Sequence, residues 1–149
     1  MPMMDEQVRD QVRKALADLT RPVRIVMFTQ REGGALECSF CQQTRELAEE
    51  VAATSAQLTL EVRDFEADRE LAATLGVDKI PALVLLADGT PPRDYGIRFY
   101  GIPAGYEFST LIEDLRLLGR GEPGLREDTL QALGQLKSPV HLQVFVTPT

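Results

Sequence analysis

The sequence contains no tryptophan, one histidine and two cysteines, and it has no long apolar run. A structural zinc site normally takes four Cys or His ligands, so these three residues exclude a complete site within one molecule. The longest apolar stretch, residues 80–87, is far shorter than the roughly 18 residues that span a bilayer. Residues 1–6 have acidic side chains where a secretory signal has basic ones. We therefore expect a cytoplasmic protein without a membrane segment.

Basic residues are also in deficit. The chain has 16 Lys and Arg against 23 Asp and Glu, which gives a net charge of −7 and a surface that repels nucleic acid and anionic membranes. With 44% hydrophobic and 26% charged residues, the composition is that of an ordinary globular domain. A chain of this length buries roughly 70% of its unfolded surface, so it needs neither metal nor disulfide to fold. The two cysteines therefore require another explanation.

The hydrophobic periodicity alternates between the helical period and the strand period along most of the chain. Apolar residues at three-and-four spacing predict helices over 5–19, 38–54, 67–75 and 107–118. Short β-branched or alternating runs predict strands over 23–28, 58–63, 82–86 and 96–100. The last two strands flank a turn at Asp88-Gly89 and are expected to be antiparallel. The pattern predicts an α/β protein with a central mixed sheet of about four strands, flanked by helices, and an extra N-terminal helix.

The C-terminal part of the sequence repeats its beginning. Ala15-Leu16 corresponds to Ala132-Leu133 and Pro22-Val23 to Pro139-Val140, at an offset of 117 residues. The interpretation is a unit over 1–119, a Gly/Pro linker over 120–124, and the first helix and strand of a truncated second unit over 125–149. The predicted strand over 140–146 has no partners of its own, so it could pair with a second molecule to form a dimer.

Cys38-Ser39-Phe40-Cys41 is the motif that carries chemistry. The pair is predicted to open a helix, where unpaired backbone N–H groups and the helix dipole stabilise a thiolate on Cys38. Cys41, one turn further in, can close a disulfide with Cys38 and release a mixed-disulfide partner. Two alternatives stay open: a soft-metal dithiol site, including zinc shared across a dimer, and a buried, inert pair.

Ile80-Pro81 precedes the third predicted strand. A proline at the start of a strand interrupts the hydrogen-bond ladder unless its position or its peptide bond is unusual. Only about 5–6% of X-Pro bonds in folded proteins are cis, so the residues alone favour trans.

A strand, a helix opening with Cys-x-x-Cys, a second strand and helix, and an Ile-Pro leading into a hairpin and closing helix together resemble the thioredoxin fold over residues 23–119. The extra first helix, the repeat and the segment 99–108 are similar, more narrowly, to the protein disulfide oxidoreductases, glutaredoxin-like proteins with two thioredoxin units in tandem. In that family the second unit's own Cys-x-x-Cys follows a strand ending Phe-Val-Thr-Pro-Thr, which matches residues 145–149.

This resemblance implies a thiol–disulfide oxidoreductase that reduces or forms protein disulfides, with Cys38 and Cys41 as its redox pair and no further cofactor. It implies that Pro81 is a cis-proline whose neighbouring backbone binds the substrate, so we expect Ile80, Pro81, Phe40 and Lys79 to contact it. The electron donor would resemble a thioredoxin reductase. The alternative functions are a non-catalytic docking unit and a soft-metal-binding dithiol protein.

The sequence also departs from the family pattern. Glu37 lies beside the presumed nucleophile and would disfavour its thiolate. The loop over 29–37 is long, and Met27 lies on the strand where thioredoxins have a buried aspartate. Lys79 could favour the Cys38 thiolate or steer substrate, although a solvated surface lysine is the simpler interpretation. The sequence leaves the reduction potential, the direction of electron flow and the substrate open.

Overall fold

A mixed sheet forms the centre of the computed structural model, which describes residues 2–147. Its strands lie in the order β2-β1-β3-β4. β1 runs parallel to β2 and antiparallel to β3, which in turn pairs antiparallel with β4. The mixed sheet of four strands expected from the sequence is confirmed. The strand bounds are β1 Val23–Thr29, β2 Leu58–Asp64, β3 Ala82–Ala87 and β4 Arg93–Tyr100.

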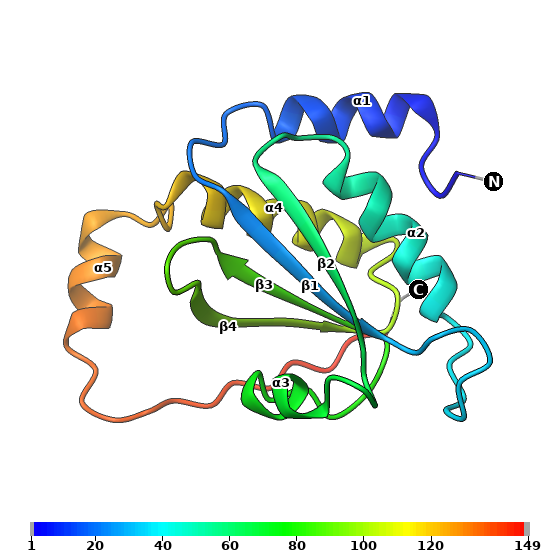
Figure 1. The fold of residues 1–149 in the computed structure, drawn as a ribbon. Coiled ribbons are helices and arrows are strands. Elements are labelled where there is room, and N and C mark those ends of the chain that lie inside the picture. The colour runs from blue at the N-terminus through cyan, green and yellow to red at the C-terminus, as the bar shows by residue number, and fades with distance from the viewer. Residues whose placement is uncertain (1, 148–149) are drawn as a thin grey trace.

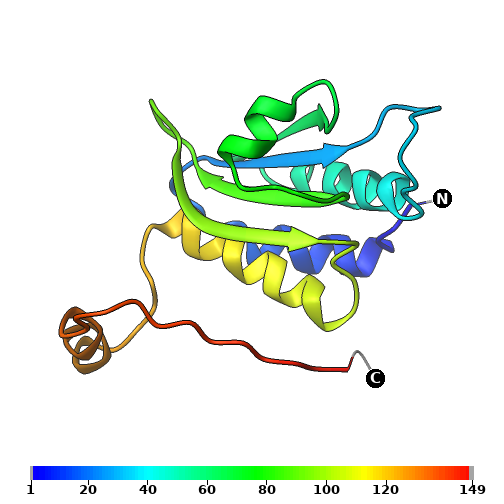
Figure 2. The same ribbon diagram turned by 90° about the horizontal axis from the view of Figure 1, so that it is seen from below.

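Helices cover both faces of this sheet. Helices α1, α2 and α4 lie on one face and the short α3 lies on the other (Figures 1 and 2). The helix bounds are α1 Glu6–Ala15, α2 Cys41–Ala52, α3 Arg69–Thr74, α4 Tyr106–Arg120 and α5 Glu127–Gly134. None of the helices within residues 2–147 has the length and apolar character that crossing a membrane requires.

β1 is an inner strand of the sheet, and both of its faces are buried. Ile25 and Met27 belong to the larger apolar cluster, which includes residues of α1, α2 and α4. Val26 and Phe28 belong to a second cluster with α3 and the segment that follows it. A strand covered on both faces is expected to be a nearly continuous apolar run, as residues 25–28 are. β1 therefore gives the loop that follows it a rigid starting point.

Two helices differ most from their predicted bounds, whereas α3 and α4 differ by one or two residues at each end. α1 ends at Ala15, yet Leu16 and Leu19 remain buried in the turn and loop that follow, which explains why the helical spacing continues to residue 19 in the sequence. α2 begins at Cys41, so the prediction that it begins at Cys38 is wrong. Residues 39–40 form a turn. A turn of this kind carries no periodic signal that separates it from the helix it precedes.

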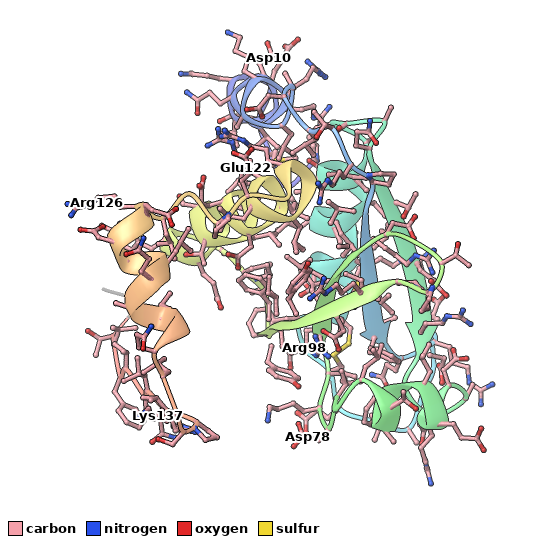
Figure 3. The ribbon with its side chains drawn as sticks, turned by 90° about the vertical axis from the view of Figure 1, so that its left-hand side faces the viewer. Asp10, Asp78, Arg98, Glu122, Arg126 and Lys137 are labelled. Atoms are coloured by element: carbon pink, nitrogen blue, oxygen red, sulfur yellow. A yellow bond between two sulfur atoms is a disulfide. The ribbon has the colours of Figure 1, made fainter. Side chains whose placement is uncertain are left out.

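The C-terminal segment lies apart from the sheet and its covering helices. α5 and the residues after it are exposed throughout, and Figure 3 shows Arg126 and Lys137 away from the body of the molecule. The segment predicted as an unpartnered strand over 140–146 pairs with no strand among residues 2–147, so the second unit to which it was assigned stays a prediction. An isolated strand has no partner for its backbone groups. Pro148 and Thr149, the last residues of the predicted second unit, lie outside the described residues.

Candidate redox site

Cys38 and Cys41 form a disulfide in which the two sulfurs differ in exposure. Their Cα atoms are 5.5 Å apart. Cys41 is the first residue of α2 and is only 6% exposed, whereas Cys38 is half-buried in the loop before the helix. An incoming thiolate therefore reaches the Cys38 sulfur more readily than the Cys41 sulfur.

The N-terminus of α2 faces this disulfide without a side-chain cap. Phe40 occupies the N-cap position, and no side chain accepts a hydrogen bond from the first turn. Free N–H groups and the positive end of the helix dipole favour an anion at this position, and a thiolate is such an anion. Glu37 is exposed beside Cys38 and is the opposing charge. The helix thus favours a thiolate on Cys38 even though Cys38 precedes the helix.

A hollow of about 380 Å³ opens next to the disulfide. The loop after β1 forms one wall of it and the first turns of α2 form the other. It is lined by Thr29, Gln30, Arg31, Glu32, Gly33, Gly34, Cys38, Cys41, Gln42 and Arg45. The hollow holds charges of both signs, because Arg31 and Arg45 are basic and Glu32 is acidic. The Arg45 guanidinium also pairs with Glu49, outside the hollow, at 2.8 Å.

Asp64, at the end of β2, holds the loop after β1 in place through a hydrogen bond. Its Oδ2 accepts a hydrogen bond from the backbone N–H of Arg31 at 2.9 Å. Its Oδ1 accepts from the N–H groups of Glu66 at 3.0 Å and Ala67 at 2.8 Å. The donors at Ala67 and Arg31 hold the pKa of Asp64 below its usual value of 3.8. The carboxylate therefore ties β2, the turn after it and the loop beside the disulfide together.

Pro81 lies at the same end of the sheet as the disulfide. It is buried, its bond to Ile80 is cis, and its carbonyl accepts a hydrogen bond from Gly101 N–H at 2.9 Å. The next residue, Ala82, pairs with Phe28 near the end of β1, from which the chain continues to the cysteines. The start of β3, the end of β1 and the start of α2 meet at this end of the sheet (Figure 1).

The other residues predicted to contact substrate occupy different surroundings. Phe40 is 53% exposed beside the disulfide, and Ile80 is half-buried before Pro81. Lys79 is exposed, pairs with Asp78 at 3.0 Å and places its ammonium 4.6 Å from the ring centre of Tyr100. Phe40, Lys79, Ile80 and Pro81 are absent from the lining of the hollow. The predicted set and the hollow therefore mark two neighbouring surfaces around one disulfide.

Two residues that support the elements carrying the disulfide were not predicted from the sequence. Asp64 has a weak signal, since an aspartate that ends a strand commonly forms a turn with the N–H groups after it. Thr44 has a clearer one, because it is the polar member of the buried α2 face that holds Cys41, Leu47, Ala48 and Val51. Asp64 could be recognised only from the structure, which places the loop beside it. Thr44 could have been recognised from its position on the predicted helix.

A thioredoxin-like sheet that carries a Cys-x-x-Cys disulfide after its central strand defines a thiol–disulfide redox protein. Comparisons with known proteins agree. The chain is similar to a protein disulfide oxidoreductase from Aeropyrum pernix K1, with a TM-score of 0.72 and 28% identity over 89% of this chain and 55% of that one. It is also similar to a variant of the alkylhydroperoxide reductase AhpF of Enterococcus faecalis, with a TM-score of 0.77 and 24% identity over 89% of this chain and 61% of that one. The thioredoxin-like fold is confirmed.

A curated relative extends this similarity in sequence. The F component of the alkyl hydroperoxide reductase of Xanthomonas campestris pv. phaseoli is 27% identical over 121 residues, which cover 81% of this chain and 19% of that protein. No family model matches the chain. The chain spans about a fifth of the length of the curated relatives it matches. The shared class is that of thiol–disulfide oxidoreductases, and the resemblance to protein disulfide oxidoreductases expected from the sequence is confirmed.

Proposed function

We propose that this chain exchanges electrons with protein disulfides through Cys38 and Cys41. The observation that carries the proposal is the asymmetry of the pair, in which the half-buried sulfur can be attacked from outside and the buried sulfur is within reach of it. In the reduced chain, the Cys38 thiolate attacks a substrate disulfide and expels one substrate thiolate. The Cys41 thiolate then attacks the Cys38 sulfur and expels the other. Two electrons pass to the substrate, and the Cys38–Cys41 bond re-forms.

The substrate would lie between the two surfaces around the disulfide. The exposed ring of Phe40 offers apolar contact, and the backbone N–H and carbonyl of Ile80 offer hydrogen-bonding groups to an extended segment, since Pro81 has no N–H and its carbonyl already accepts from Gly101. Lys79 is paired with Asp78, and this pairing weakens the attraction that Lys79 can exert on an acidic substrate. We therefore assign Phe40, Ile80 and Pro81 the larger share of binding and Lys79 the smaller.

The reaction requires a partner that restores the dithiol. No organic cofactor or metal enters the exchange itself, since the disulfide carries the electrons. The Xanthomonas relative is one component of an alkyl hydroperoxide reductase, and this favours a second redox protein as donor or acceptor. We propose a disulfide reductase similar to thioredoxin reductase in that role, in the cytoplasm.

The first experiment is insulin reduction by dithiothreitol, followed by precipitation of the freed B chain. The wild-type chain is expected to accelerate the reaction, and Cys38→Ser is expected to return it to the rate of dithiothreitol alone. Cys41→Ser should instead accumulate a mixed disulfide with insulin, visible by mass spectrometry without reductant. Ser39→Ala, between the two cysteines, is the matched control and should retain activity.

A glutathione redox titration completes the test. A reversible transition between about −120 and −270 mV, the range from DsbA to thioredoxin, is expected of an exchange catalyst. A couple below about −300 mV would indicate a structural disulfide. That result, or a wild-type chain no faster than dithiothreitol alone, would overturn the proposal and favour a docking unit.

A further inference from the structure

Thr44 is a fully buried polar residue about one helical turn after Cys41, the buried half of the disulfide. It lies on α2, three residues after Cys41, and its exposed fraction is 0%. Cys41, Leu47, Ala48 and Val51 share its buried helix face. Polar side chains at such positions are nearly always hydrogen-bonded, so an exception requires an explanation.

The Thr44 hydroxyl is such an exception. Its Oγ1 has no hydrogen-bond partner among residues 2–147, whereas its backbone N–H donates to the Phe40 carbonyl at 2.9 Å. Thr54, which follows the other end of α2, is also buried and donates its hydroxyl to the Val51 carbonyl at 2.7 Å. An unpaired buried hydroxyl destabilises the state that contains it. The structure with the disulfide closed is that state.

The direction of the side chain identifies the missing partner. Cα–Cβ bonds in an α-helix tilt toward its N-terminus, so Thr44 leans toward the turn that begins at Cys41. Residues three apart have Cβ atoms about 5–6 Å apart, close enough for their outer atoms to form a hydrogen bond. In the closed disulfide the Cys41 sulfur is bonded to Cys38 and is a poor acceptor. Reduction frees it.

We propose that Thr44 is a positioning residue that acts through Cys41 and favours the reduced form of the pair. This inference rests on the proposed function. When a dithiol, or two molecules of glutathione, supplies two electrons, the Cys38–Cys41 bond breaks and the donor becomes a disulfide. The Thr44 hydroxyl then donates a hydrogen bond to the Cys41 thiolate, whose proton has passed to solvent. The unpaired hydroxyl raises the free energy of the oxidised state and the new bond lowers that of the reduced state, so both effects favour reduction.

The same bond assists the resolving step. Burial raises the pKa of a thiol, and Cys41 is almost fully buried. A hydrogen bond donated to its thiolate offsets that cost. The Cys41 thiolate is the group that attacks the mixed disulfide at Cys38, so its population sets the rate of substrate release.

The test is Thr44→Val, which removes the hydroxyl and keeps the shape of the side chain. In a glutathione titration, the equilibrium constant for reduction of the disulfide by glutathione is expected to fall about tenfold, which is about 30 mV toward a more negative potential for a two-electron couple. Thr44→Ser restores a hydroxyl and should restore most of the wild-type potential. Thr54→Val, which removes a satisfied hydroxyl at the far end of the same helix, should leave the potential unchanged.

A second measurement isolates Cys41. In a Cys38→Ser background, the ultraviolet absorbance of the thiolate reports the pKa of Cys41 alone. Adding Thr44→Val is expected to raise that pKa, whereas adding Thr54→Val is not. A purely structural role for Thr44 would change the unfolding midpoint without moving this pKa.

The outcomes separate the two proposals. If the wild-type pair shows no reversible transition with glutathione, the proposed function fails. If the wild-type pair titrates normally but Thr44→Val has the wild-type potential, or a more positive one, the role of Thr44 fails and the proposed function stands. An equal shift in Thr54→Val would also overturn it, because the effect would then belong to the whole helix.

Discussion

At the scale of a single residue, the hydrogen bonds of the Asp64 carboxylate lead to a testable prediction. Its two oxygens have separate tasks, since Oδ2 binds the Arg31 N–H and Oδ1 binds the turn after β2. Asp64→Asn keeps an oxygen for the two turn donors but presents an amide to the Arg31 N–H. The variant is therefore expected to release the loop beside the disulfide while the turn stays intact.

We expect Asp64→Asn to speed hydrogen exchange at the Arg31 amide and to lower the rate of insulin reduction more than the rate of alkylation of Cys38 by iodoacetamide. Iodoacetamide is small and reaches the Cys38 sulfur without contacting the loop that forms the wall of the hollow, whereas a protein substrate contacts that loop. Asp88→Asn, on a turn far along the sheet from the disulfide, is the matched control. Equal losses in both rates would contradict a role for the loop in substrate contact.

The pKa of Asp64 also predicts how the loop responds to acid. This pKa is lowered in the folded chain, so the unfolded chain takes up the proton first as pH falls. The contribution of the carboxylate to stability is present above about pH 4 and is lost as pH falls through the folded pKa. Exchange at the Arg31 amide, corrected for intrinsic rates, should rise below about pH 4 in the wild type and stay flat in Asp64→Asn.

At the scale of elements, Glu50 joins the N-terminal segment to α2. Its carboxylate accepts from the N–H groups of Met3 and Met4 at 2.6 and 2.9 Å and binds Arg9 at 3.2 Å. Met4 is thereby held at 3% exposure in the main cluster. Burial raises the pKa of Glu50, yet these donors outweigh it, and the net pKa is lowered from 4.5.

Glu50→Ala should lower the free energy of unfolding by about 1–2 kcal/mol, because two backbone donors and one arginine lose their acceptor. Urea denaturation measures the change. Glu49→Ala removes only an exposed pair with Arg45 on the same helix and should cost less than about 0.5 kcal/mol. Similar losses in the two variants would contradict a stabilising role for the Glu50 contacts with the N-terminal segment.

The elements themselves were largely predictable, and the reasons are local. β1 and β3 are runs of apolar residues with both faces covered, and α4 has an unbroken apolar stripe through Leu111, Leu115 and Leu118. The start of α2 was not predictable, since nothing in Cys38-Ser39-Phe40 distinguishes a turn from a first helical turn. The two cysteines were evident from their spacing. Their surroundings were not, because Asp64 reaches Arg31 across 33 residues of sequence.

At the scale of the whole molecule, the buried core ends before the linker. The last buried residue among those described is Gly119, and residues 121–147 are exposed, including Leu130, Leu133 and Leu142. The internal repeat aligns this segment with α1 and β1. Within residues 2–147, however, the segment forms no sheet of its own. Its apolar side chains are available to another surface.

Removing residues 125–149 is expected to change the free energy of unfolding by less than about 0.5 kcal/mol, since surface changes away from the core rarely cost more. The same truncation should abolish any concentration-dependent self-association of the full chain, measured by sedimentation velocity. A truncated chain that unfolds at clearly lower urea would contradict the separation of the unit from the segment. A truncated chain that still dimerises would place the contact elsewhere.

The two margins of the sheet are not equivalent. β2 forms one margin, where Glu61 pairs with both Arg63 and Arg24 and Arg63 also reaches Asp68. A strand that adds to this margin would lie beside these paired charges. Charged edges of this kind oppose edge-to-edge growth. β4 forms the other margin and is irregular at its pairing with Leu85 and Leu86. β4 also carries Arg93, Asp94 and Arg98, and both edge charges and irregular pairing oppose edge-to-edge growth, so ordered aggregation of this fold is opposed at both margins, by charge alone at β2 and by charge together with irregular pairing at β4.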